Sequence, residues 1–244
     1  MPVSPKPERP IAYPQVVANA SAATDMPLPA AFHKAAVANL VGLYSSDGIW
    51  PKMPDNPRAV AEFEAGQRFL VEEKDVESAI CSFEACISDE PTFLEAYISL
   101  GVAYAMSNTD DGLAAAEDVF IGLISMESSG WISKAVVSMI HQNLGSVYLM
   151  RASDCTTTDC DRDGWLQHSD SQFELSDSAG GPSNGVPDRL ELLCPWAYVK
   201  QQLNQPPEAA ALIRRIVSFV DANDAWDALT DFIAKYPSLA ALGQ

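Results

Sequence analysis

Nothing in this 244-residue sequence has the pattern of a membrane-spanning or targeting segment. It contains no run of about 18 apolar residues, so we expect no membrane-spanning helix. Its first residues, Met1 to Pro10, lack the apolar stretch of a secretory signal and the arginine-rich amphipathic pattern of a transit peptide. A mature organellar protein whose presequence had been removed would look the same at this end.

Basic residues are also scarce. The chain has 15 Lys and Arg against 33 Asp and Glu, which gives a formal net charge of −18. Such a field repels nucleic-acid phosphates and anionic lipids, and it attracts basic protein surfaces. We therefore expect other proteins as partners, within a larger complex, and neither nucleic acid nor membrane. The alternative is that the acidity only keeps the protein in solution.

Cysteine is sparse, and its count of five is odd. Cys81 and Cys86 lie on different faces of a helical pattern, which makes them poor disulfide partners. Cys155 and Cys160 lie in an acidic loop, where they could pair under oxidation. We expect a reducing intracellular compartment, either the cytoplasm or an organelle matrix if a presequence has been removed.

Recognisable catalytic motifs are absent from the sequence. None of the three histidines, His33, His141 and His168, lies in a nucleophile elbow or a metalloprotease helix. No glycine-rich phosphate loop is present, and Cys194 has no partner at redox spacing. We predict no catalytic residue and no enzymatic activity. A weaker alternative is an enzyme without a motif, which would need a deep polar pocket with perturbed carboxylates.

The composition divides the chain into five segments. Seven prolines in the first 29 residues exclude helix there and predict an extended arm. Strand-like alternation is not convincing anywhere, so we expect an all-α protein. The segments are 1–29, a Pro-rich extended arm; 30–56, an N-terminal helix and linker; 57–151, helical repeats; 152–187, an acidic, Gly/Ser-rich loop region with a short helix; and 188–244, C-terminal helices.

Three boundaries follow from local residue patterns. The helix expected over residues 30–44 has Phe32, Ala36, Leu40 and Leu43 near one face. Asn56-Pro57 predicts a helix start, with asparagine as the cap and proline at the first helical position. The C-terminal helices are expected near 188–203, 207–220 and 223–236, and Pro195 should kink or shorten the first of them.

Two adjacent patterns have a spacing that is specific enough to suggest a family. The first is a large residue, a Leu-Gly pair and a tyrosine at helical spacing: Tyr97, Leu100, Gly101 and Tyr104. The second precedes it and alternates small and large residues before a proline: Ala79, Phe83, Cys86 and Pro91. The glycine would let a second helix approach closely, and the proline would stop one helix and redirect the chain. Together they resemble the tetratricopeptide repeat (TPR), whose period is 34 residues.

The resemblance extends to later helices. The first pattern recurs as Leu144, Gly145 and Tyr148, after a helix with Ala116, Phe120 and Leu123. This interval, from Gly101 to Gly145, exceeds the period by about ten residues. Weaker matches are residues 59–73, with Phe63 and Gly66 one residue out of register, and the C-terminal pair with Ala228, Phe232 and Pro237. The resemblance implies a TPR-like α-solenoid of helical hairpins. The alternative is an ordinary helical bundle with chance matches.

The first helices of stacked TPR hairpins line a concave groove, and the resemblance implies which residues would face it. Most of them are apolar or carry amides, which suits an adaptable binding surface. The partner-binding residues implied are Glu95, Ile98, Val102, Met106, Met139, Gln142, Asn143, Leu149 and Met150. Their expected partner is a basic or amphipathic protein segment. The alternative is that the predicted 30–44 helix or the C-terminal helices cover them.

Residues 159–170 are similar to the twelve-residue calcium loop of an EF-hand. Alternating aspartates around a glycine turn supply oxygen ligands, and Asp170 replaces the usual final glutamate. The ligands implied are Asp159, Asp161, Asp163, Trp165 and Asp170. No other cofactor is expected, and the alternative for this segment is a solvated acidic loop.

The sequence therefore predicts a non-enzymatic protein-binding scaffold or accessory subunit of a larger assembly. The alternative from a different class is a calcium-responsive regulatory protein that uses the 159–170 loop.

Overall fold

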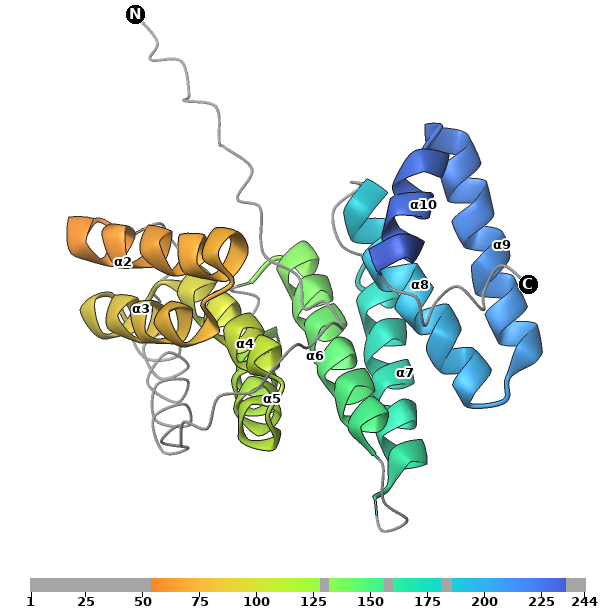
Figure 1. The fold of residues 1–244 in the computed structure, drawn as a ribbon, viewed down its shortest axis with the longest axis horizontal. Coiled ribbons are helices and arrows are strands. Elements are labelled where there is room, and N and C mark those ends of the chain that lie inside the picture. The colour runs from red at the N-terminus through yellow and green to blue at the C-terminus, as the bar shows by residue number, and fades with distance from the viewer. Residues whose placement is uncertain (1–53, 128–131, 156–159, 181–185, 236–244) are drawn as a thin grey trace, which may run out of the picture.

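The structure, a computed structural model, describes residues 54–127, 132–155, 160–180 and 186–235. Within these ranges every regular element is helical and no strand occurs, which confirms the all-α prediction (Figure 1). No described helix is long and apolar enough to cross a membrane. The predicted arm at 1–29, and the predicted helix and linker up to residue 53, lie outside the described residues.

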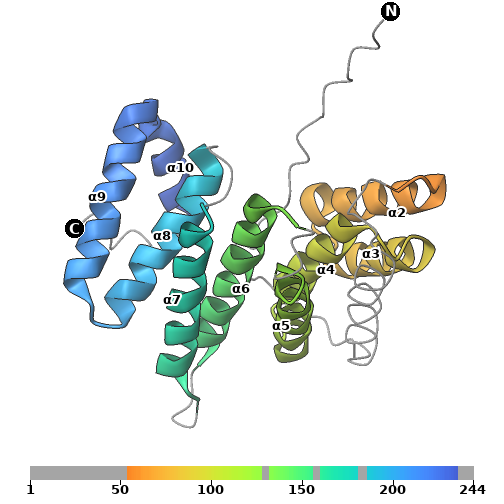
Figure 2. The same cartoon turned by 180° about the vertical axis from the view of Figure 1, so that it is seen from behind.

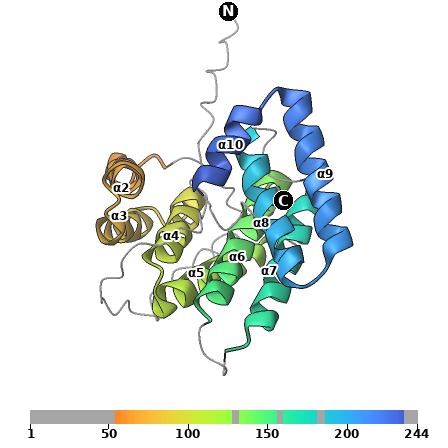
Figure 3. The same ribbon diagram turned by 45° about the vertical axis from the view of Figure 1, so that its right-hand side comes forward.

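The described helices form four consecutive hairpins and a final helix. They are α2 (Pro57–Arg68), continued by a short π-helix (Phe69–Glu73), with α3 (Val76–Asp89); α4 (Leu94–Ser107) with α5 (Asp110–Ile124); α6 (Lys134–Asp154) with α7 (Arg162–Ser178); and α8 (Val186–Gln202) with α9 (Pro206–Asn223), followed by α10 (Trp226–Lys235). From α2 to α9, each helix packs mainly against its sequence neighbours (Figure 2). The last helix, α10, folds back onto α8 and α9 (Figure 3).

Side chains before the helices explain where several of them begin. The amide oxygen of Asn56 accepts a hydrogen bond from the Arg58 N–H at 3.0 Å, and Pro57 is the first residue of α2, as predicted. Thr109 caps α5 and Ser133 caps α6 in the same way. These caps satisfy N–H groups that have no partner inside the helix.

A π-helix explains the one-residue register difference in the first hairpin. A π turn has one more residue than an α turn and inserts as a bulge in a longer helix. Here it follows Arg68 and ends at Lys74, whose left-handed backbone (φ 59°) terminates the helix before Asp75 caps α3. Gly66 and Gly101 are 35 residues apart, one more than the 34-residue period.

The region predicted as a loop with a short helix, 152–187, is more ordered than expected. It contains α7, a 17-residue helix that packs along α6. The low hydrophobicity and the many serines of this segment do not predict so long a helix. Its buried positions nevertheless have the four- and three-residue spacing of the second TPR helix, with Ser169, Phe173 and Ser176 in place of Ala79, Phe83 and Cys86. Pro195 also does not shorten its helix, since α8 continues through it to Gln202.

The buried apolar side chains form two clusters that meet at α6. The first runs from α2 to α6 and includes the fully buried rings of Phe83, Tyr97 and Phe120. The second begins at Leu149 on α6 and extends through α7, α8 and α9 to Phe232 on α10. Because α6 contributes to both, it connects the N-terminal and C-terminal halves of the described chain.

Candidate functional site

Three hairpins are closed by the same contact between a glycine and a phenylalanine. A β-carbon placed on Gly66 would lie 2.6 Å from the Phe83 ring, and one on Gly101 would lie 2.8 Å from Phe120. One on Gly145 would lie 2.9 Å from Phe173. All three separations are shorter than real side chains tolerate, so only glycine permits these helices to approach so closely.

Residues at corresponding positions around these contacts are also small. The residue four positions before each phenylalanine is fully buried and is alanine, alanine or serine: Ala79, Ala116 and Ser169. In the third hairpin the serine hydroxyl adds a hydrogen bond, because Ser169 Oγ donates to the carbonyl of Gly145 at 2.8 Å. Small side chains at these positions leave room for the crossing helix.

Two tyrosines connect the second and third hairpins to the hairpins before them. Tyr104 on α4 donates to a carboxylate oxygen of Glu84 on α3 at 2.7 Å, and Tyr148 on α6 donates to Glu117 on α5 at 3.0 Å. Burial, reinforced by the neighbouring carboxylates, raises the pKa of both tyrosines well above the ordinary value. Glu117 also forms an ion pair with Arg151 at 3.0 Å, so the connection between α5 and α6 includes a charge.

The predicted groove residues lie on α4 and α6 and are mostly inside the chain. Glu95 and Met106 are half-buried, whereas the other seven are buried: Ile98, Val102, Met139, Gln142, Asn143, Leu149 and Met150. Ile98, Val102, Met139 and Met150 belong to the first buried cluster, whereas Leu149 packs into the C-terminal cluster. The side chains of these seven residues are therefore not exposed on the surface of the described structure.

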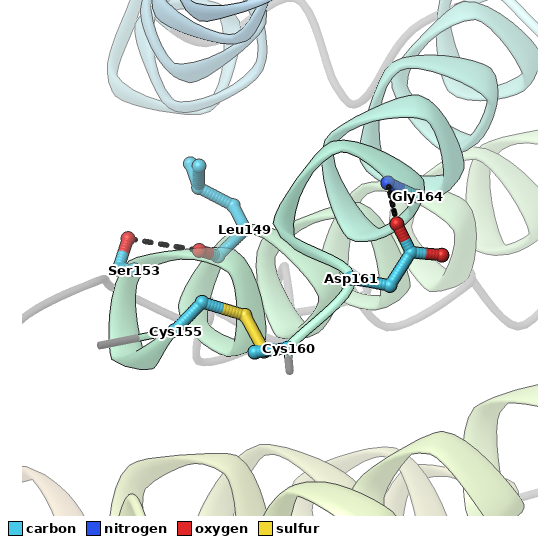
Figure 4. The surroundings of a disulfide bond; sticks show 6 residues. All are labelled: Leu149, Ser153, Cys155, Cys160, Asp161 and Gly164. Carbon is cyan, nitrogen blue, oxygen red and sulfur yellow. Dashed lines mark hydrogen bonds between the residues drawn. A yellow bond between two sulfur atoms is a disulfide. The ribbon is translucent and has the colours of Figure 1, made fainter. Parts of the chain in front are cut away.

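The described part of the acidic segment is helical. Asp161 is the N-terminal cap of α7, where its carboxylate accepts a hydrogen bond from the Gly164 N–H at 3.0 Å (Figure 4). Asp163, Trp165 and Asp170 lie within the helix, and Asp159 lies outside the described residues. Nine residues of helix separate Asp161 from Asp170 by about 13 Å along the axis, so this conformation does not bring them together. Among the described residues, no group of three potential ligands is close enough to hold a metal ion.

Asp170 instead joins α7 to α8. Its two carboxylate oxygens accept hydrogen bonds at 2.8 Å from the Trp196 ring N–H and from the Lys200 ammonium. The side chains of Asp170 and Lys200 are 16% and 14% exposed, so this ion pair is largely shielded from water. The EF-hand resemblance implied that Asp170 is a metal ligand. No pattern in the sequence indicates that Lys200, 30 residues later, lies beside it.

The five cysteines divide into a disulfide and three free thiols. Cys155 follows α6 and Cys160 precedes α7, and their sulfur atoms are bonded (Figure 4). The sequence analysis named this disulfide, between Cys155 and Cys160, as one that could form under oxidation. Cys81 is exposed, whereas Cys86 and Cys194 are buried.

Another buried contact between α6 and α7 was not expected from the sequence. His141 is 5% exposed, and its ring Nδ1 lies 2.7 Å from the side-chain oxygen of Gln172. Ser138 Oγ donates to the carbonyl of Ser176 at 2.9 Å. Because this interface consists of polar side chains on both helices, a search for apolar residues at helical spacing does not predict it. The histidine is therefore part of helix packing in the third hairpin.

Comparison of the chain with models of protein families, with curated proteins and with solved structures found no match.

Proposed function

We propose that the chain is a non-enzymatic scaffold of the TPR type, which binds a basic or amphipathic segment of a partner protein within a larger assembly. The observation that carries this proposal is the repetition of one contact in three successive hairpins, from Gly66 to Phe83, Gly101 to Phe120 and Gly145 to Phe173. A chance Leu-Gly-x-x-Tyr match in an ordinary bundle would not place each glycine against an aromatic ring of the next helix.

The connections between hairpins support the same proposal. Each tyrosine three residues after its glycine reaches the second helix of the preceding hairpin, Tyr104 through Glu84 and Tyr148 through Glu117. Corresponding residues therefore make corresponding contacts in consecutive units, which is how a stacked repeat protein is built. The fourth hairpin, α8 with α9, continues the stacking without a glycine contact among its described residues.

The kind of partner follows from charge and from the binding face. The chain has a net charge of −18, which attracts basic segments and speeds their association. Half-buried Met106 is the most accessible apolar residue of the face implied on α4, and it provides an adaptable contact for an aliphatic or aromatic side chain. A helix with one basic and one apolar face meets both conditions.

Affinity capture with the intact chain as bait tests this function. We compare the wild-type chain with Met106→Glu, which places a charge on the proposed binding face. The matched control is Ile121→Glu on α5, since Ile121 is 48% exposed and lies outside that face. Quantitative mass spectrometry should show proteins with basic amphipathic segments that are lost with Met106→Glu and retained with Ile121→Glu. If both variants retain the same proteins, the face around Met106 is not the binding surface. Far-ultraviolet circular dichroism checks that both variants fold.

A further inference from the structure

The disulfide between Cys155 and Cys160 joins the end of α6 to the start of α7 (Figure 4). Cys155 is the C-terminal cap residue of α6, and Cys160 comes immediately before Asp161, the N-terminal cap residue of α7. The two cysteine Cα atoms are 5.5 Å apart. The bond therefore fixes the distance between these two helix ends.

The first turn of α7 is held by hydrogen bonds that all end at Cys160 or Asp161. The N–H of Arg162 donates to the carbonyl of Cys160 at 3.0 Å, and the N–H of Trp165 donates to the carbonyl of Asp161 at 3.1 Å. The Asp161 carboxylate accepts a hydrogen bond from the Gly164 N–H at 3.0 Å. Asp161 is exposed, so water competes for its carboxylate. Because the first N–H groups of a helix have no partner inside it, the position of Cys160 and Asp161 decides how firmly this turn stays closed.

The same turn carries two side chains that contact other hairpins. The guanidinium carbon of Arg151 lies 4.8 Å from the ring centre of Trp165, and Arg151 forms an ion pair with Glu117 on α5 at 3.0 Å. In the other direction, Arg162 donates to the side-chain oxygen of Gln202, at the end of α8, at 2.7 Å. The start of α7 is thus connected to the second and the fourth hairpin.

A thiol reagent in solution can reach this bond. Cys155 and Cys160 are both half-buried, whereas the free thiols of Cys86 and Cys194 are buried. Thiol–disulfide exchange requires a thiolate to approach one sulfur of the bond, so its rate depends on access. The disulfide is therefore open to exchange under conditions in which the two buried thiols stay inert.

We propose that the Cys155–Cys160 disulfide is a reversible redox switch, which holds the start of α7 closed when oxidised and loosens its contacts with the second and fourth hairpins when reduced. The reductant is a dithiol. Its first thiolate attacks one cysteine sulfur and displaces the other, which takes up a proton. Its second thiol then displaces the first cysteine, so the reagent leaves as a cyclic disulfide and the protein gains two thiols, with two electrons and two protons. This switch goes beyond the proposed scaffold function and requires no partner protein.

The effect of reduction should be confined to the helix ends. Farther along the third hairpin, Phe173 packs on Gly145, and Ser138 Oγ donates to the carbonyl of Ser176 at 2.9 Å. These contacts do not involve the cysteines. A disulfide between residues only five positions apart also removes less entropy from the unfolded chain than one that closes a long loop. The hairpin therefore stays folded after reduction, while the start of α7 opens more often.

Hydrogen exchange of single amides, followed by nuclear magnetic resonance on the full chain, tests the switch. One sample is oxidised with oxidised glutathione, which releases two reduced glutathione molecules for each disulfide formed, and the other is reduced with dithiothreitol. We expect the amides of Gly164 and Trp165 to exchange about tenfold faster after reduction, because their acceptors at Asp161 are no longer fixed to α6. The amide of Phe173 should not change.

Two results would overturn the proposal. One is equal exchange at Gly164 and Trp165 in the two samples, although mass spectrometry confirms the disulfide in one and two additional thiols in the other. The second is a chain in which Cys155 and Cys160 stay unbonded in oxidised glutathione. Faster exchange along the whole of α6 and α7 would also contradict it, because that result reports general unfolding of the hairpin.

Matched cysteine variants identify the thiols that respond. Cys155→Ser combined with Cys160→Ser cannot form the bond, so its first turn of α7 should exchange as fast as in the reduced chain under both conditions. Cys81→Ser removes the exposed free thiol and should respond as the wild-type chain does. A double variant that still responds to dithiothreitol would assign the response to another cysteine and contradict the proposal.

Arg162→Met separates the loosening of α7 from its transmission to α8. In the wild-type chain, reduction should also speed exchange of the Leu203 N–H, which donates to the Val199 carbonyl at 2.9 Å next to Gln202. The variant has no donor for Gln202, so its Leu203 amide should exchange at one rate in both redox states, while Gly164 still responds. A redox response at Leu203 in Arg162→Met, or none in the wild-type chain, would contradict transmission through Arg162.

Discussion

The ring of Phe173 lies so close to the backbone of Gly145 that a β-carbon on the glycine would come within 2.9 Å of it. This contact joins α6 to α7, the two helices that connect the N-terminal and C-terminal halves of the described chain. It repeats the arrangement of Gly101 and Phe120 one hairpin earlier. The close packing of the two helices within each of these hairpins therefore depends on the absence of a side chain at the glycine.

Substitution of this glycine should destabilise the chain. In an exposed helix, Gly→Ala stabilises by up to about 1 kcal/mol through helix propensity. In Gly145→Ala the added methyl group overlaps a fully buried ring, and overpacking of this kind costs about 1 to 3 kcal/mol. We expect a net loss of stability, measured as a lower midpoint in urea denaturation followed by circular dichroism.

The matched control for this prediction is Gly145→Ala combined with Phe173→Leu. The smaller leucine leaves room for the methyl group, so the double variant should be more stable than the sum of the two single effects predicts. Additive losses would mean that Gly145 and Phe173 do not constrain each other.

Some of the fold could be predicted because it depends on local sequence. The start of α2 follows from Asn56 and Pro57, which act on their own backbone. The glycines at 101 and 145 were identified through their spacing to leucine and tyrosine. The sequence does not indicate the full extent of α7, because two of its four buried residues are serines, whose hydroxyls find partners only in the folded hairpin, as Ser169 does at Gly145.

Asp170 should matter for stability because it joins α7 to α8 through a shielded ion pair. Asp170→Ala leaves Lys200 and the Trp196 N–H without their acceptor, and breaking a buried pair in this way costs about 3 to 5 kcal/mol at most. The pair here is about 15% exposed, so we expect a loss toward 2 kcal/mol. Asp170→Asn keeps an oxygen for Trp196 and should lose less. An Asp170→Asn chain as stable as the wild type in urea denaturation would show that the charge contributes nothing, whereas equal losses in both variants would assign the whole effect to the charge.

The candidate site was harder to predict than the fold. The family resemblance implied which side of α4 carries Ile98 and Val102, but not whether that side is open, because burial depends on parts of the chain far away in sequence. The aspartates of 159–170 were grouped by their spacing alone. Spacing did not reveal that the helix begins at Arg162 or that Lys200 lies beside Asp170.

The cysteines should react with a maleimide in a fixed order. Burial raises the pKa of Cys86 and of Cys194 to about 12, so at pH 8 almost no reactive thiolate forms at either residue. The pKa of exposed Cys81 is raised less, by partial burial and by the nearby carboxylates of Glu84, Glu77 and Asp75. Native labelling should modify Cys81 alone, and urea should expose two more thiols. Mass spectrometry counts them, and five labelled cysteines without a reductant would contradict the disulfide.

The same thiols predict a loss of stability in alkali. Because their pKa is higher in the folded than in the unfolded chain, the unfolded state releases protons first as the pH rises. The stabilisation of the folded chain by these two protonated thiols is complete below about pH 8.5 and is lost progressively toward pH 12. The urea midpoint should therefore fall in this window. Cys86→Ala lowers stability at every pH by leaving a small cavity, but it should reduce the size of the alkaline fall. An unchanged fall in that variant would assign the effect to other groups.

Calcium should leave the chain unchanged if α7 keeps its helical start. An EF-hand loop at 159–170 requires the first two turns of α7 to unwind, which would remove Trp165 from its stack on Tyr148, at 5.8 Å between ring centres, and from Arg151. It would also take Asp170 from Lys200. We expect no saturable change in tryptophan fluorescence and no binding heat at millimolar calcium. A saturable response that Asp161→Ala abolishes would instead favour the calcium-responsive alternative, because Asp161 caps the helix through Gly164 and would be a ligand only in the unwound loop.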